Sequence, residues 1–338
     1  MQTIHKMKFI KNISASSTKI PDKLKKPTEN SGLSIIDNGL KKKVFSLKYS
    51  EPLEKDMAII LVYFNTQQSL RIIQNLLYVK HMLDVAKIPY YIGEMSIQGS
   101  PYLFEESSTI FHLQSNDIMF YKEVIINLIE PRIDSKYTKL CMMDADILFD
   151  NMNWYTLLSA KLNHVTICQP FNSAVWLNIS YNSIVRSNES CLKNPLGHVG
   201  LVWAFQRDWF SRYKFPNSFN GGGDTVFKLA VCNKEACGLY PYLANYLSNY
   251  INALPANITS AYLEEVNVYH LYHGSLFNRQ YVNRHVKFNT MLNKLHLSKL
   301  EDIVYYSEDG IVRWNPEHRD LFNAFMSDYL SARDDDSV

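Results

Sequence analysis

Apolar runs and amphipathic stretches alternate along the first part of the chain. Ala58 to Phe64 is a continuous apolar run of strand length, and from Thr66 to Ala86 apolar residues recur at helical spacing. Thr66 is the expected N-cap of that helix. Tyr90 to Ile92 then begins a second short strand after Pro89. A strand, a helix and another strand in this order predict a βαβ unit, and therefore a parallel sheet.

The alternation continues beyond this unit. It predicts helices at residues 121–128 and 154–162 and from Asp224, strands at 139–143, 165–169 and 199–205, and a short early strand at 44–47. Residues 178–195 are rich in Asn and Ser, and we expect a long loop there that closes over substrate. Residues 288–338 should be helical in patches, with an unstructured acidic end.

These elements predict an α/β fold with a mostly parallel central sheet flanked by helices. We expect one large domain at residues 51–290. A basic, partly disordered N-terminal arm should precede it at residues 1–50, and a helical extension with an acidic tail should follow at 291–338.

Composition narrows the function classes. The 338 residues are 46% hydrophobic, enough for a large core, and the net charge of +2 gives no global field for binding nucleic acid. Residues 1–50 carry eleven Lys and three acidic residues, which is typical of a solvated arm; peripheral contact with an anionic membrane is the alternative. No run of 18 apolar residues and no good signal peptide is present, so we expect a cytoplasmic protein.

The sequence Asp144-Ala145-Asp146 is the strongest candidate for a chemical site. It follows the apolar run Leu140 to Met143 and precedes another, Ile147 to Phe149. Two carboxylates at the mouth of a buried strand are costly to desolvate unless something compensates them. Mn²⁺ or Mg²⁺, which prefer oxygen ligands, could bind both acids and bridge to a diphosphate. The alternative is a strand end with two solvated acids.

Two later motifs add polar groups. In Asn220-Gly221-Gly222-Gly223-Asp224, three glycines permit positive φ and close approach of the backbone to a ligand, and Asp224 would cap the next helix. A plain glycine turn is the alternative. His270-Leu271-Tyr272-His273-Gly274 precedes Arg279 and Arg284, whose forked donors suit phosphate oxygens. The alternative here is core histidines and solvated arginines.

Residues 137–154, YTKLCMMDADILFDNMNW, resemble the DxD region of the GT-A glycosyltransferases, which use nucleotide sugars. The order of the early strand, the Asp-x-Asp, the Gly-Gly-Gly-Asp and the His-Gly motifs is also similar, and the resemblance covers residues 56–288. It implies a GT-A fold and metal-dependent transfer of a sugar from a nucleotide diphosphate sugar, with UDP as the commonest nucleotide. The acceptor would be a hydroxyl on a glycan or protein, and a bacterial or viral source would fit best.

The resemblance also implies roles for individual residues. Asp224 would be the general base if the enzyme inverts. His273 would be a further metal ligand, and Gly274 would let the backbone approach the diphosphate; His270, which no glycine follows, matches less well. The remaining implied contacts are Phe64, Asn65 and Thr66 with the nucleotide, and Trp203, Gly222 and Gly223 with the acceptor.

Two other classes of protein stay open. A nucleotidyltransferase would normally have a glycine-rich, basic segment directly after the first strand, where Asn65-Thr66-Gln67 stands. A noncatalytic glycan-binding protein could keep the same fold. No phosphate-binding G-x-x-x-x-G-K-[ST] loop, G-x-G-x-x-G fingerprint, paired zinc spacing or G-x-S-x-G elbow is present.

Overall fold

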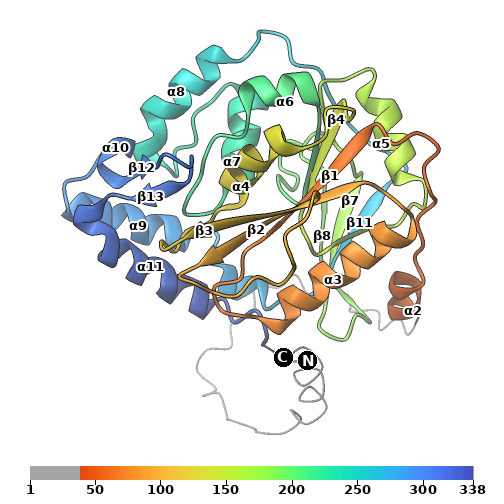
Figure 1. Cartoon of the computed structure of the whole chain (residues 1–338), viewed down its shortest axis with the longest axis horizontal. Coiled ribbons are helices and arrows are strands. Elements are labelled where there is room, and N and C mark those ends of the chain that lie inside the picture. The colour runs from red at the N-terminus through yellow and green to blue at the C-terminus, as the bar shows by residue number, and fades with distance from the viewer. Residues whose placement is uncertain (1–38, 338) are drawn as a thin grey trace, which may run out of the picture. The chain divides into compact units, whose positions relative to one another are not determined.

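The computed structural model describes residues 39–337, and the largest sheet in this part of the chain has seven strands (Figure 1). Its order is β10-β6-β9-β4-β1-β2-β3. Strands β1, β2, β3 and β4 are mutually parallel, whereas β9 runs antiparallel between β4 and β6. The expected α/β fold with a mostly parallel central sheet is therefore confirmed. The bounds are β1 Met57–Tyr63, β2 Tyr90–Ile97, β3 Ile110–Ser115, β4 Lys139–Met143, β6 Ile167–Gln169, β9 Val202–Gln206 and β10 Ser260–Tyr262.

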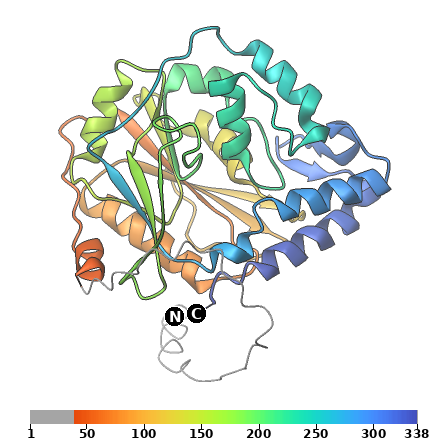
Figure 2. The same ribbon diagram turned by 180° about the vertical axis from the view of Figure 1, so that it is seen from behind.

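A second sheet has the order β5-β11-β7-β8, and Figure 2 shows it from behind. Strand β11 is antiparallel to β5 and parallel to β7, and β8 is antiparallel to β7. Only Asp144, Ala145 and Asp146 separate β4 from β5, so the chain passes from the first sheet to the second at the Asp-x-Asp motif. The bounds are β5 Ile147–Phe149, β7 Ser173–Leu177, β8 Ile184–Glu189 and β11 Asn267–His270.

Strand β1 is apolar throughout because both faces of the central sheet are covered. Its side chains alternate between two core clusters: Ala58 and Ile60 lie in one, and Met57, Ile59 and Leu61 in the other. The first cluster includes residues of α4 Lys122–Ile129, α6 Arg207–Tyr213, α7 Gly223–Lys228, α8 Ala244–Ala253, α9 Asn283–Lys294, α10 Leu300–Ile303 and α11 Arg319–Ala332. The second cluster includes residues of α2 Leu40–Phe45, α3 Leu70–Val85 and α5 Trp154–Leu162.

Within residues 39–337, no helix has the length and apolar character needed to cross a membrane.

Helix α3 begins later than the periodicity predicts. Gln68 has a left-handed φ of 54°, and Ser69, not Thr66, is the N-cap. The Ser69 hydroxyl accepts a hydrogen bond from the Ile72 amide, which satisfies one of the first N–H groups of the helix. The predicted strand 139–143 and helix 154–162 are confirmed with the same bounds.

Three further expectations from the sequence are wrong. Residues 44–47 form no strand, because Leu40–Phe45 is helix α2. Strand β8 lies within the predicted loop 178–195, and the hairpin of β12 Val304–Tyr306 and β13 Val312–Trp314 was not foreseen. The acidic end is ordered by contacts, and Asp335 is only 8% exposed. The basic arm and its membrane contact lie mostly in residues 1–38, outside the described residues.

Candidate metal and donor site

The Asp-x-Asp turn is held between the ends of two strands. The Asp144 amide donates to the Leu201 carbonyl at 2.8 Å, and the Leu271 amide donates to the Asp146 carbonyl at 2.8 Å. Strand β11 pairs antiparallel with β5 so that His270 lies opposite Ile147. This register carries the residues that follow β11 to the carboxylate of Asp146.

Asp146, His270 and His273 form a compact group of potential metal ligands. One donor atom from each lies within 4.8 Å of the others. Nε2 of His273 is 2.8 Å from Oδ2 of Asp146, and Nε2 of His270 is 3.8 Å from the same oxygen. Oδ1 of Asp146 is buried and accepts no hydrogen bond from any described residue. Because such an atom is costly without a partner, the group fits a cation that takes carboxylate and imidazole ligands, such as Mn²⁺.

The electrostatics of this group favour metal binding. Burial raises the pKa of Asp146, but the neighbouring His270 and His273 together lower it by a larger amount, so the net shift of the pKa is downward. Burial lowers the pKa of His270 to about 3, outweighing the attraction of Asp146. At neutral pH, Asp146 is therefore ionised and His270 is neutral, which are the protonation states that bind metal.

Asp144 has a different partner from Asp146. Nζ of Lys122, at the start of α4, lies 2.7 Å from Oδ1 of Asp144 and 3.0 Å from Oδ2 of Asp224. Burial lowers the pKa of Lys122, but the two carboxylates outweigh burial and raise it. Sequence reasoning missed Lys122, since one lysine in a helical pattern carries no spacing signal. Lys122 joins the predicted metal ligand Asp144 to the predicted base Asp224.

The glycines before Asp224 serve packing. Gly222 has a φ of 80° and is the N-cap of α7, so Asp224 lies in the first turn and is not the cap. A Cβ at Gly222 would collide with the Tyr240 hydroxyl, and one at Gly223 would collide with the Glu123 carboxyl. Positive φ is confirmed at Gly222, but these glycines approach buried side chains, and we do not propose them as acceptor contacts.

Two other predicted contacts are buried in the core. Trp203 is 1% exposed, packs edge-on against Phe227 and donates from Nε1 to the Val199 carbonyl at 2.9 Å. Its ring has no face for stacking on a sugar. Arg284 is 5% exposed and donates to the Tyr329 hydroxyl at 2.6 Å. We therefore propose neither an acceptor contact at Trp203 nor a phosphate contact at Arg284.

The predicted nucleotide residues line a hollow after β1. Phe64, Asn65 and Thr66 form one wall with Gln67 and Ile72, and the other wall comes from the end of the chain. Asn65 is mostly turned to the protein: its amide donates to the Ser69 carbonyl at 2.8 Å, and its Oδ1 accepts from the Ser69 amide at 2.9 Å. Asn65 therefore shapes this loop. The residues of the second wall are Leu330, Arg333 and Asp335.

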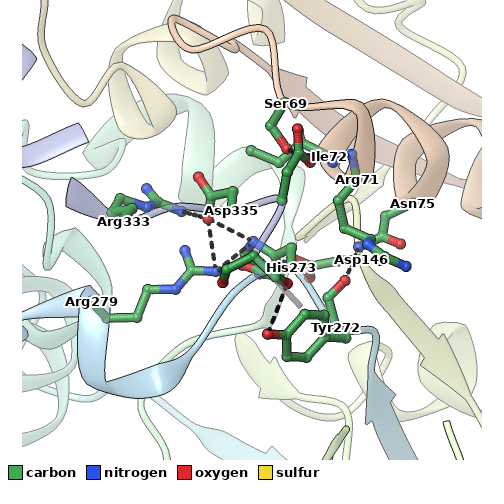
Figure 3. A network of polar contacts seen from close by, with 12 residues as sticks. Ser69, Arg71, Ile72, Asn75, Asp146, Tyr272, His273, Arg279, Arg333 and Asp335 are labelled. Carbon is green, nitrogen blue, oxygen red and sulfur yellow. Dashed lines mark hydrogen bonds and ion pairs between the residues drawn. The ribbon is translucent and has the colours of Figure 1, made fainter. Parts of the chain in front are cut away.

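The acidic end of the chain contacts Arg279 and Gly274, two residues expected to bind the diphosphate; Figure 3 shows Asp335 beside Arg279. Arg279 donates to the His273 carbonyl and pairs with Asp335 at 3.1 Å. Asp335 also lies 3.5 Å from Nδ1 of His273 and 3.3 Å from Arg333. Gly274 has a φ of 90°, and a Cβ there would be 2.9 Å from the Asp334 carbonyl. Sequence reasoning missed Arg333 and Asp335.

No family model and no curated protein matches this sequence. Among solved structures, the catalytic domain of Drosophila β1,4-galactosyltransferase 7 with xylobiose has 16% identity and a TM-score of 0.33, covering 52% of this chain and 60% of that chain. A point mutant of the same enzyme with manganese, UDP-Gal and xylobiose has 12% identity and a TM-score of 0.37, covering 80% and 98%. A putative glucose-1-phosphate thymidylyltransferase from Bacillus anthracis has 12% identity and a TM-score of 0.31, covering 61% and 87%. At these values the likeness concerns the arrangement of strands and helices alone.

Proposed function

We propose that this protein is a metal-dependent glycosyltransferase that moves a sugar from a nucleotide diphosphate sugar to a hydroxyl on a glycan or protein. UDP-sugars are the first donors to test. The observation that carries the proposal is the convergence of Asp146, His270 and His273 around a carboxylate oxygen without a hydrogen bond. Arg279 lies beside this group, and Asp335, which contacts both His273 and Arg279, also lines the hollow after β1.

The cation would be held by the Asp146 carboxylate and the His270 and His273 imidazoles. Mixed oxygen and nitrogen ligands favour Mn²⁺ over Mg²⁺, which prefers oxygen alone. When bound, the cation neutralises the charge that develops on the diphosphate leaving group. Asp144, which pairs with Lys122 at 2.7 Å, is the proposed donor contact next to this group.

Asp224 is the proposed general base of an inverting reaction. An acceptor hydroxyl is a poor nucleophile, and its proton must leave as the new glycosidic bond forms. The Asp224 side chain is 21% exposed, so a hydroxyl can reach it, and Nζ of Lys122 lies 3.0 Å from its Oδ2. The carboxylate would orient the hydroxyl and accept its proton.

Calorimetry with UDP tests the donor site. We expect the wild type to bind UDP in the presence of Mn²⁺ and weakly or not at all in its absence. Asp146→Asn should lose the effect of Mn²⁺, whereas Asp208→Asn, which removes an exposed carboxylate in α6, should keep it. A glycan-binding protein without enzymatic activity would ignore UDP, and that outcome would refute the proposal.

A product assay separates the two transferase reactions. A glycosyltransferase releases UDP from a UDP-sugar, whereas a nucleotidyltransferase releases pyrophosphate from a nucleoside triphosphate and a sugar 1-phosphate. We expect release of UDP that depends on Mn²⁺ and on Asp146. Release of pyrophosphate in its place would assign the site to nucleotidyl transfer.

A further inference from the structure

The acidic end of the chain pairs with Arg279, which lies beside the candidate metal group. The Asp335 carboxylate lies 3.1 Å from Arg279, 3.3 Å from Arg333 and 3.5 Å from Nδ1 of His273. The opposite nitrogen of the same imidazole, Nε2, faces Asp146 at 2.8 Å. Asp335 is therefore one histidine ring away from the proposed metal ligand, and it is 8% exposed.

A second carboxylate of this segment caps helix α3. The Asp336 side chain accepts from the Leu70 amide at 3.0 Å, the Arg71 amide at 2.8 Å and the Ser69 hydroxyl at 2.7 Å. The first N–H groups of a helix attract anions, because they have no partner within the helix and carry the positive end of its dipole. The Tyr272 hydroxyl also donates to the Ser337 carbonyl at 3.2 Å, so both sides of the site hold the segment.

We propose that residues 333–337, here called the acidic tail, regulate the proposed donor site by competing with the diphosphate of the nucleotide sugar. This inference rests on the proposed function. A diphosphate needs the Arg279 guanidinium that Asp335 occupies, and the Asp334 carbonyl covers Gly274, where the ligand would approach the backbone. The tail and the donor cannot both hold these positions, so the tail must leave before a nucleotide sugar binds.

The docked tail also carries costs that favour its exchange for a stronger anion. Nε of Arg333 is buried and makes no hydrogen bond to the described residues, which is unfavourable for a cationic side chain. Asp334 has a φ of 46°, in the left-handed region. A diphosphate with a bound metal offers more charge and more acceptor oxygens than one carboxylate. A nucleotide sugar binds only those molecules whose tail is undocked. The docked tail therefore reduces the apparent donor affinity in proportion to the undocked fraction.

Calorimetry with UDP and Mn²⁺ tests the competition. The double variant Asp335→Asn with Asp336→Asn should bind UDP about tenfold more tightly than the wild type, because fewer molecules keep the tail docked. Asp334→Asn is the matched control: its side chain is exposed, and Asn accepts a left-handed φ. Its affinity should equal that of the wild type. Equal affinity of wild type and double variant would overturn the inference alone, whereas no UDP binding by any of the proteins would overturn the proposed function and the inference with it.

Limited digestion of the wild type tests the same idea without a substitution in the site. The Arg333 side chain is 11% exposed and paired with Asp335, so trypsin should cut after it slowly. UDP with Mn²⁺ should speed this cleavage several-fold relative to Mn²⁺ alone, because the nucleotide displaces the tail. Cleavage that is unchanged or slower with UDP would show that the tail stays docked, and would overturn the inference.

Discussion

Lys122 Nζ lies 2.7 Å from Asp144 Oδ1, so the first acid of the Asp-x-Asp motif is neutralised by an ammonium group. The second acid, Asp146, faces two imidazoles instead. The two carboxylates are close in sequence but have different partners. Asp146 therefore suits a metal, and Asp144 belongs to an ion-paired group that continues through Lys122 to Asp224.

Removing the charge of Lys122 should destabilise the fold. Lys122→Met keeps the length of the side chain but leaves Asp144 and Asp224 facing each other without a cation. We expect a loss of about 2 kcal/mol in the free energy of unfolding, measured by urea denaturation. Lys122→Arg should lose less, and adding Asp224→Asn to Lys122→Met should recover part of the loss. A Lys122→Met protein as stable as the wild type would show that the ion pairs contribute nothing.

Asp224→Asn separates catalysis from binding. The substituted amide cannot accept a proton at neutral pH, so sugar transfer should fall about 10²- to 10⁴-fold. Calorimetry should show UDP and Mn²⁺ binding close to that of the wild type, because Asp224 lies outside the proposed metal group. If UDP binding is lost along with activity, Asp224 has a scaffolding role.

His270 should contribute to metal affinity although its sequence context ranks it below His273. We expect His270→Gln to weaken Mn²⁺ binding about tenfold or more, measured by electron paramagnetic resonance titration. His198→Gln is a suitable control, since His198 packs against the same Trp176 ring as His270 but is not in the metal group. Equal Mn²⁺ affinity in both variants would leave His270 with a packing role only.

Local signals predicted the part of the site that lies on one strand. Strand 139–143 and the acids after it could be found because an apolar run followed by two carboxylates is a pattern of adjacent residues. Parallel pairing of β4 with β1 then places those acids at the edge where the first strand also ends. His273 was identified as a candidate metal ligand only through the resemblance of its His-Gly motif to that of a known family.

Long-range contacts explain what the sequence could not predict. Lys122 meets Asp224 across 102 positions, and Ser69 meets Asp336 across 267 positions. Neither partner has a local pattern that points to the other, and the run Asp334 to Asp336 has the composition of a solvated end. Positive φ was expected correctly at Gly222, but periodicity does not reveal that the Tyr240 hydroxyl lies beside it.

A buried carboxyl beneath the site should make stability depend on pH. The Glu123 side chain is 3% exposed. Burial raises its pKa, Lys122 lowers it and Asp224 raises it, and the net result is a pKa of about 8. Between the ordinary value of 4.5 and about 8, the folded state binds a proton that the unfolded state has lost. The contribution of Glu123 to stability is therefore fully present below pH 4.5 and is lost as the pH rises to about 8, with a slope of at most about 1.4 kcal/mol per pH unit.

The variant Glu123→Gln tests this dependence. Glutamine cannot ionise, so its free energy of unfolding should fall less between pH 5 and pH 8 than that of the wild type, by roughly 1 to 3 kcal/mol over the interval. Glu308→Gln, at an exposed position, should follow the wild-type curve. Urea denaturation at closely spaced pH values gives the three curves. Parallel curves for wild type and Glu123→Gln would mean that Glu123 is ionised throughout, with Lys122 compensating its charge despite the burial.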